Sequence, residues 1–141
     1  MDSRVKEKAL FIGRTALEKK ASDVVILEVG ALTTVADYFV FCSGSSERQV
    51  RAIADAIEKE VAGRFAAFPS LEGTSSATWI LLDYRDIVVH VFREDIRAYY
   101  GIEKMWRDAK QIPRVEYDQI LSPHSRATHT SPSPVAVPQA S

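Results

Sequence analysis

The stretch TWILLDYRDIVVHVF, residues 78–92, decides the fold of this chain. It contains two short runs rich in β-branched and aromatic residues, 78–83 and 86–92, and such runs are typical of strands. Only Tyr84 and Arg85 lie between the runs, so the stretch predicts a tight antiparallel hairpin. The usual Asn-Gly pair is absent from the turn, which leaves the turn type open.

This hairpin has two different faces, because side chains alternate across a strand. A two-residue turn predicts three pairs on one of them: Trp79 with His90, Leu81 with Val88, and Asp83 with Asp86. The opposite face is wholly aliphatic and suits a core beneath helices; it carries Ile80, Leu82, Ile87, Val89 and Val91. The first face, here called the mixed face, combines aromatic, aliphatic and polar residues: Trp79, Leu81, Asp83, Asp86, Val88, His90 and Phe92.

The mixed face has the composition of a protein interface, in which tryptophan often supplies much of the binding energy. The alternative is that another helix covers it, such as the one that carries Tyr99, Tyr100 and Trp106. Periodicity favours neither. Arg85 and Arg93 are either a polar rim to such an interface or ordinary solvated charges.

The preceding residues predict two helices and two strands. Apolar residues at helical spacing indicate a helix from about residue 3 to residue 20, and β-branched runs indicate strands at 23–29 and 38–43. Ser46 and Gln49 fit a capping box that starts a second helix over 46–62, with Gly63 as its stop.

A short strand is expected in the linker that passes Pro69 and Gly73 towards the hairpin. After the hairpin, Glu94 opens a third helix that kinks at Gly101 and ends before Pro113. The order α-β-β-α-β-β-β-α predicts an α/β (α+β) fold, with helices packed on a mixed sheet of roughly five strands.

Composition describes an ordinary globular domain of 141 residues, with 46% apolar and 26% charged residues. The formal net charge of -1 gives no signature of direct nucleic-acid binding. A ribonucleoprotein target would therefore be contacted mainly through a protein component. The chain shows no secretory signal and no membrane span, so a cytoplasmic protein is expected. Cys42, the single cysteine, lies in an apolar run and is expected to be buried.

The last residues differ from the rest of the chain. Residues 122–141 are rich in serine and proline and contain no acidic residue, a composition that predicts a disordered tail after a folded domain over 1–121. His124 and His129 lie in this tail without other metal-ligand candidates nearby.

Catalytic interpretations of single residues are weak. Asp83 and Asp86 flank a turn, where aspartate is a common turn former, and no third ligand lies nearby in sequence. Asp83 and His90 lie at opposite ends of the hairpin, too far apart for acid–base work. The segment 44–46 before the second helix has the position of an anion site, but a Gly-Ser-Ser turn with a helix cap is commonplace. No enzyme activity, cofactor or metal is therefore expected.

Three segments in order resemble the Iojap-like ribosomal silencing factor family. The first comprises residues 37–40 (DYFV), 42–46 (CSGSS) and 49–50 (QV); the second comprises 72–73 (EG), 79–84 (WILLDY) and 86–92 (DIVVHVF). The third comprises Arg97, 99–100 (YY) and 102–106 (IEKMW). The resemblance as a whole covers about residues 4 to 108. Arg85 stands where the family often has glycine, and Ile102 and Met105 stand where it often has leucine.

The resemblance implies a fold related to nucleotidyltransferases and a function without chemistry. It implies binding to the fourteenth protein of the large ribosomal subunit, at the face that meets the small subunit. A protein seated there blocks subunit joining and represses translation. Some family members also form homodimers. The partner-binding residues carried over are Trp79, Leu81, Asp83, Asp86, Val88, His90, Tyr100, Glu103, Lys104 and Trp106.

The alternative of another class is a nucleotidyltransferase-like enzyme. Nucleotidyl transfer commonly uses two metal ions held by several carboxylates. An Asp-x-Asp strand after Gly44 and Ser45 would support it, but a helix is predicted there, and Asp83 and Asp86 lack that spacing. A homodimer with some other partner remains a third hypothesis.

Overall fold

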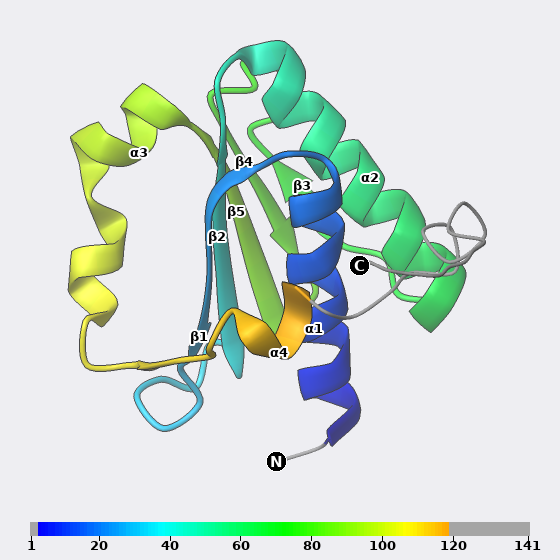
Figure 1. The fold of residues 1–141 in the computed structure, drawn as a ribbon, viewed down its shortest axis with the longest axis vertical. Helices are drawn as coiled ribbons and strands as arrows, with labels where there is room; N and C mark the ends of the chain where they lie inside the picture. The colour runs from blue at the N-terminus through cyan, green and yellow to red at the C-terminus, as the bar shows by residue number, and fades with distance from the viewer. Residues whose placement is uncertain (1–2, 119–141) are drawn as a thin grey trace, which may run out of the picture.

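The computed structural model describes residues 3–118, which form one six-stranded mixed sheet with helices on both faces (Figure 1). The strand order is β3-β4-β5-β2-β1-β6, and only β2 and β5 run parallel. The strands are β1 (Ser22–Glu28), β2 (Tyr38–Gly44), β3 (Ser70–Glu72), β4 (Trp79–Asp83), β5 (Ile87–Arg93) and β6 (Lys110–Gln111). The α+β class and the mixed sheet are confirmed, with one strand more than predicted.

Two apolar cores lie on opposite faces of this sheet. Helices α1 (Ser3–Glu18), α2 (Glu47–Phe65) and α4 (Val115–Asp118) pack on one face, and α3 (Glu94–Tyr100) with the 3-10 helix η1 (Ile102–Trp106) lies over the other (Figure 1). The aliphatic face of the hairpin lies in the core beneath α1 and α2, as predicted: Ile80, Leu82, Ile87, Val89 and Val91. None of the described helices is long and apolar enough to cross a membrane.

Helix α2 begins as its sequence predicts and ends later. The Ser46 hydroxyl accepts a hydrogen bond from the Gln49 backbone N–H at 3.1 Å, which confirms the helix cap. Gly63 was predicted as the stop, but the helix runs on to Phe65 and ends at Ala66, whose φ of 52° is left-handed. Phe65 accounts for the extension, because its ring packs edge-on against Phe11 of α1 at 5.5 Å between centroids.

The third predicted helix is divided in two. Gly101, with a φ of 55°, ends α3 in the left-handed conformation that glycine adopts without strain. The chain then turns into η1 rather than continuing through a kink. Strand β6 and helix α4 were not predicted. The Lys-Gln composition of β6 does not favour a strand, and it forms because β1 offers an edge, where Leu27 pairs with Gln111.

The predicted hairpin exists, but its register is shifted by two residues. Trp79 pairs with Phe92, Leu81 with His90, and Asp83 with Val88. The turn holds three residues, Tyr84, Arg85 and Asp86, and Arg85 adopts a left-handed φ of 76°. A shift of two residues leaves every paired side chain on its predicted face.

The remaining predictions concern the C-terminal tail and Cys42. The tail over 122–141, with His124 and His129, lies outside the described residues. Cys42 is fully buried, as predicted, and burial raises the pKa of its thiol to about 12.

Candidate partner-binding surface

The mixed face is partly covered by a helix and partly open, and the interface interpretation stays a prediction for the open part. Helix α3 and η1 cover Val88 and Phe92 together with Phe39 and Phe41 of β2. Strand β4 lies nearer the margin, and its Trp79, Leu81 and Asp83 remain half-buried. The open part is therefore the β4 side of the hairpin.

His90 lies in the covered part, with 7% of its surface exposed. Its ring stacks on Phe41 at 4.8 Å and meets Phe39 edge-on at 5.6 Å. Burial lowers the pKa of His90 to about 4, so the imidazole is neutral near pH 7. Val88 beside it is also buried. These two predicted contact residues have little surface to offer a partner, and they lie beneath the open part.

Trp79 connects the covered and open parts. Its Nε1–H donates a hydrogen bond to Nδ1 of the neutral His90 at 3.2 Å. Its ring packs on Phe92 at 4.9 Å and on Tyr100 of α3 at 5.4 Å between centroids. The indole is thus held from below and from one side, while part of it stays exposed. A large aromatic side chain held in this way is typical of an interface anchor.

Exposed side chains of α3 and η1 extend this open part. Tyr100 is 58% exposed, as its predicted role requires, and Tyr99 (81%) and Met105 (76%) are also exposed. We call Trp79, Leu81, Tyr99, Tyr100 and Met105 the aromatic surface. Tyr99 and Met105 were not among the predicted contact residues. The sequence offered only their position beside Tyr100 and Trp106 as a signal. It could not show that they are exposed, because exposure on so short a helix depends on how the helix packs against the sheet.

Glu103 is held inside the protein by an ion pair. Arg97, which is 8% exposed, donates from Nε and Nη2 to both carboxylate oxygens of Glu103, at 2.8 and 2.6 Å. Its Nη1 donates to the Asp23 carbonyl at 2.7 Å and to the Ser43 hydroxyl at 2.8 Å. The hydrogen bonds from Arg97 lower the pKa of Glu103. Glu103 therefore fastens η1 to α3 and to the sheet, and Arg97, absent from the predicted set, makes this possible.

Trp106 and Lys104, the other two predicted contact residues of η1, differ in their exposure. Trp106 is half-buried and packs edge-on against Phe39 at 4.8 Å, which fixes η1 over the sheet. Lys104 is exposed, and its side chain makes no hydrogen bond or ion pair with any described residue. Tyr100 and Lys104 are thus the predicted residues of this segment that are most accessible to a partner.

Asp86 does not lie on the mixed face. Its Oδ2 accepts a hydrogen bond from Nζ of Lys8 at 3.0 Å, so the side chain points towards α1. The cause is the left-handed Arg85, which redirects the chain before β5 begins. Asp83 instead accepts a hydrogen bond from the Arg85 backbone N–H at 2.7 Å. The structure therefore separates the two carboxylates that a shared metal site would need.

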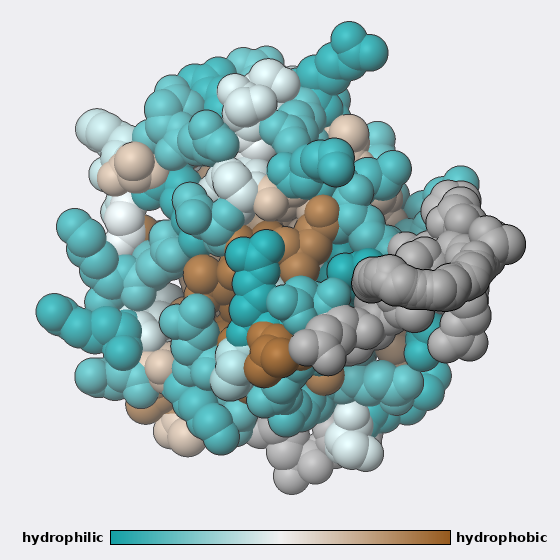
Figure 2. Space-filling model, in the orientation of Figure 1, coloured by the Kyte–Doolittle hydropathy of each residue, from teal (hydrophilic) through white to brown (hydrophobic). Residues whose placement is uncertain are grey.

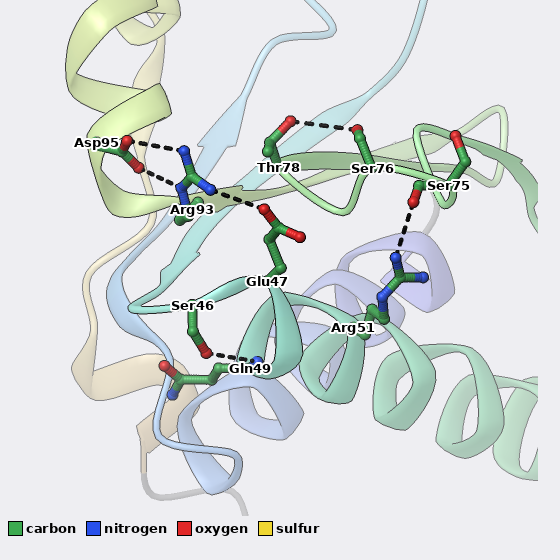
Figure 3. Close-up of polar contacts among 9 residues, drawn as sticks. All are labelled: Ser46, Glu47, Gln49, Arg51, Ser75, Ser76, Thr78, Arg93 and Asp95. Atoms are coloured by element: carbon green, nitrogen blue, oxygen red, sulfur yellow. Dashed lines mark hydrogen bonds and ion pairs between the residues drawn. The ribbon is translucent and has the colours of Figure 1, made fainter.

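The carboxyl ends of the parallel strands β2 and β5 carry a network of internal ion pairs (Figure 3). Arg93 donates to both oxygens of Asp95, at 2.7 and 3.0 Å, and to Glu47 at 2.9 Å. The hydrogen bonds from Arg93 lower the pKa of Asp95. Arg51 of α2 donates to the carbonyl of Ser75 at 2.9 Å. The described residues contain no group of three His, Cys, Asp or Glu that could hold a metal ion.

This network bears on the anion site considered at the start of α2. Ser46 caps the helix, and the Glu47 carboxylate lies in its first turn, where it already interacts favourably with the helix dipole. A second anion there would meet that carboxylate. The charged side chains at this end of the sheet therefore pair with one another, which does not favour an anion site there.

Comparisons with known proteins agree on one family. The family model described as "Ribosomal silencing factor during starvation" matches residues 2–140. The ribosomal silencing factor RsfS of Halalkalibacterium halodurans is 44% identical over 105 residues, which cover 74% of this chain and 87% of that protein. A crystal structure of a Bacillus halodurans protein has a TM-score of 0.64 at 37% identity, and the match covers 79% of this chain and 99% of that chain.

A more distant relative comes from mouse. It is called "Mitochondrial assembly of ribosomal large subunit protein 1" and is 27% identical over 92 residues, which cover 63% of this chain and 40% of that protein.

Proposed function

We propose that this chain, which belongs to the family of ribosomal silencing factors, binds the large ribosomal subunit through its fourteenth protein, keeps the small subunit from joining, and so represses translation. The name of the mouse relative, which refers to the large subunit, supports that choice of target. The steric mechanism needs no reaction. It needs only an affinity high enough to occupy the joining face.

The aromatic surface is the observation that carries this proposal. The rings of Trp79, Tyr100 and Tyr99 contact one another in turn on the open β4 side of the hairpin, and Met105 adds a further exposed side chain on η1. Scattered exposed apolar residues are normal on a monomer, whereas a contiguous group with a held tryptophan marks an interaction site. Tryptophan, tyrosine and methionine are also the residues enriched in interface cores.

The nucleotidyltransferase alternative finds less support in the geometry. In open α/β sheets, ligands bind at the carboxyl ends of parallel strands. In this protein Arg93, Glu47 and Asp95 pair with one another at that position. Asp83 and Asp86 point to different partners. A regulatory binding protein explains the aromatic surface, which an active site at the other location would leave without a role.

The proposal is tested by co-sedimentation of the purified protein with isolated large subunits, with small subunits as the control. We expect binding to large subunits alone, and fewer joined ribosomes when small subunits are added afterwards. Binding to the isolated fourteenth protein should also be measurable. Equal joining with and without the protein, despite binding, would contradict the steric mechanism; no binding to large subunits would contradict the target.

A second copy of this chain is the competing occupant of the aromatic surface, since the resemblance implies homodimers in some members. If the two partners use the same residues, adding the fourteenth protein must convert homodimers to heterodimers. Sedimentation velocity with and without that protein distinguishes competition from independent binding.

A further inference from the structure

Four exposed cationic side chains lie along the segment that comes after the aromatic surface in sequence: Lys104, Arg107, Lys110 and Arg114. We call them the basic strip. None of the four makes a hydrogen bond or an ion pair through its side chain with any described residue. Their charges are therefore available to a partner.

Many other cations of the described chain are already engaged. Lys8 pairs with Asp86, Arg93 with Glu47, and Arg97 with Glu103. Of the acids near the strip, Glu103 is held by Arg97 and Glu116 pairs with Lys6 at 3.1 Å. Glu28 lies opposite Lys110 in the sheet, and Asp23 and Glu94 line the cleft beside Lys104. Asp108 is the one acidic residue between the four cations in sequence. The net charge of -1 for the whole chain hides this local excess of positive charge.

The strip runs along one edge of the sheet. From η1 the chain passes below β1, pairs there as the edge strand β6, and enters α4 (Figure 1). Lys104 and Arg114 line the same cleft of about 680 Å³ between η1 and α4. Figure 2 shows hydrophilic side chains projecting along the margin where η1 lies, around an apolar centre over β1 and α1. Lys104 of the strip directly precedes Met105 of the aromatic surface within η1, whereas Lys110 lies on β6, the edge of the sheet opposite to β3 and β4.

We propose that the basic strip binds the phosphate backbone of ribosomal RNA beside the protein partner. This inference rests on the proposed function, since docking the aromatic surface on the large subunit would bring the strip against whatever adjoins the partner. The main anionic surface of a ribosomal subunit is RNA. Arginine matches phosphate through paired N–H donors and lysine through a point charge. Such contacts add affinity and orientation without reading the RNA sequence.

The proposal changes one expectation drawn from composition. A net charge near zero predicted little direct contact with nucleic acid, with the target contacted mainly through protein. A few unpaired cations on one edge suffice for a secondary contact, because each phosphate neutralised releases counterions and adds to the binding free energy. The protein partner still provides specificity.

The test compares two double variants over about 50 to about 300 mM salt. In the strip variant, Arg107→Glu and Lys110→Glu are combined; both residues lie outside the aromatic surface. In the matched control, Arg48→Glu and Lys59→Glu are combined, because these exposed cations of α2 are also unpaired within the described residues. Each protein is titrated against intact large subunits and against the isolated fourteenth protein. Thermal unfolding confirms that all of them fold.

The strip variant should bind intact subunits about tenfold more weakly than the control, with a salt slope smaller by about one to two. Its affinity for the isolated protein should equal that of the control. If the strip variant binds intact subunits with the affinity and the salt slope of the unmodified chain, the RNA contact is overturned and the proposed function still stands. An equal loss on the isolated protein would assign the strip to that protein instead. Failure of the unmodified chain to bind either target would overturn both proposals.

Discussion

At the scale of single residues, His90 lies beneath the surface on which the sequence had placed it. It was predicted to contact the partner, but it is buried and accepts a hydrogen bond from Trp79. A histidine can do this only while one ring nitrogen is free of a proton. Its low pKa keeps it in that state, so His90 orients the anchor of the aromatic surface from below.

The first prediction concerns His90 and pH. Because its pKa falls from 6.5 to about 4 on folding, the unfolded chain takes up a proton first, and stability is lost as the pH falls from about 6.5 towards 4. The loss should reach about 2 kcal/mol by about pH 4.5. His90→Gln, which keeps an acceptor but does not titrate, should lose much less over this range. Chemical denaturation at several pH values measures both; parallel curves would contradict the assignment.

The second prediction concerns Trp79. Trp79→Ala should weaken binding to large subunits by about 30-fold or more, the usual effect of removing an interface anchor. The domain should keep a cooperative thermal transition, because the main core lies on the opposite face of the sheet. Phe68→Ala is the control, since Phe68 is exposed outside the aromatic surface. If Trp79→Ala abolishes the transition, the indole is a core residue rather than an anchor.

At the scale of elements, the end of α2 shows how packing overrides a local signal. Glycine commonly stops a helix, yet Gly63 lies within α2, and Ala66 adopts the left-handed cap. Packing of Phe65 on Phe11 holds the last turn in place. In the segment from α3 to η1 the local signal holds, since Gly101 does end its helix. The ion pair between Arg97 and Glu103 then fixes the position of η1.

The third prediction concerns Gly63 and its place inside α2. A Cβ added at Gly63 would meet nothing within 4 Å, so Gly63→Ala should raise the free energy of unfolding by about 0.5 to 1 kcal/mol. Gly73→Ala should destabilise the protein, because Gly73 has a φ of +81° and its Cβ would collide with the Trp79 carbonyl. Urea denaturation compares the two. A loss of stability in Gly63→Ala would mean that α2 ends there after all.

At the scale of the whole molecule, the two proposed contacts share η1, which carries Met105 and Lys104, and extend from there towards β4 and towards the edge strand β6. The aromatic surface and the basic strip together use residues 79–114, within the described part of the chain. A protein bound through both would place α1 and α2 away from the subunit surface, since they cover the opposite face of the sheet (Figure 1). Its bulk would then stand in the way of the small subunit.

The fourth prediction concerns the Ser/Pro-rich segment over 122–141. Removing the chain after Leu121 should leave affinity for large subunits within about twofold of the full chain, because neither proposed contact uses the removed residues. Co-sedimentation and the joining experiment measure both proteins side by side. A severalfold loss of affinity would assign part of the binding to this segment.

The sequence by itself determined the element order from α1 to α3, the cap of α2 at Ser46 and the two faces of the hairpin. These features depend on residues close in the chain: alternation along a strand, spacing along a helix, and a hydroxyl three residues from the amide it satisfies. The faces are correct for every residue of the hairpin except Asp86 in the turn, even though the register is not, because a two-residue shift preserves alternation.

Only the tertiary structure decided which part of the mixed face stays open. Val88 and His90 are covered, Asp86 turns towards Lys8, and Glu103 pairs with Arg97. Each outcome depends on a partner from another element: η1 over the sheet, α1 beneath the turn, or α3 beside η1. Periodicity shows that a face exists, but only the docking of distant segments removes water from it.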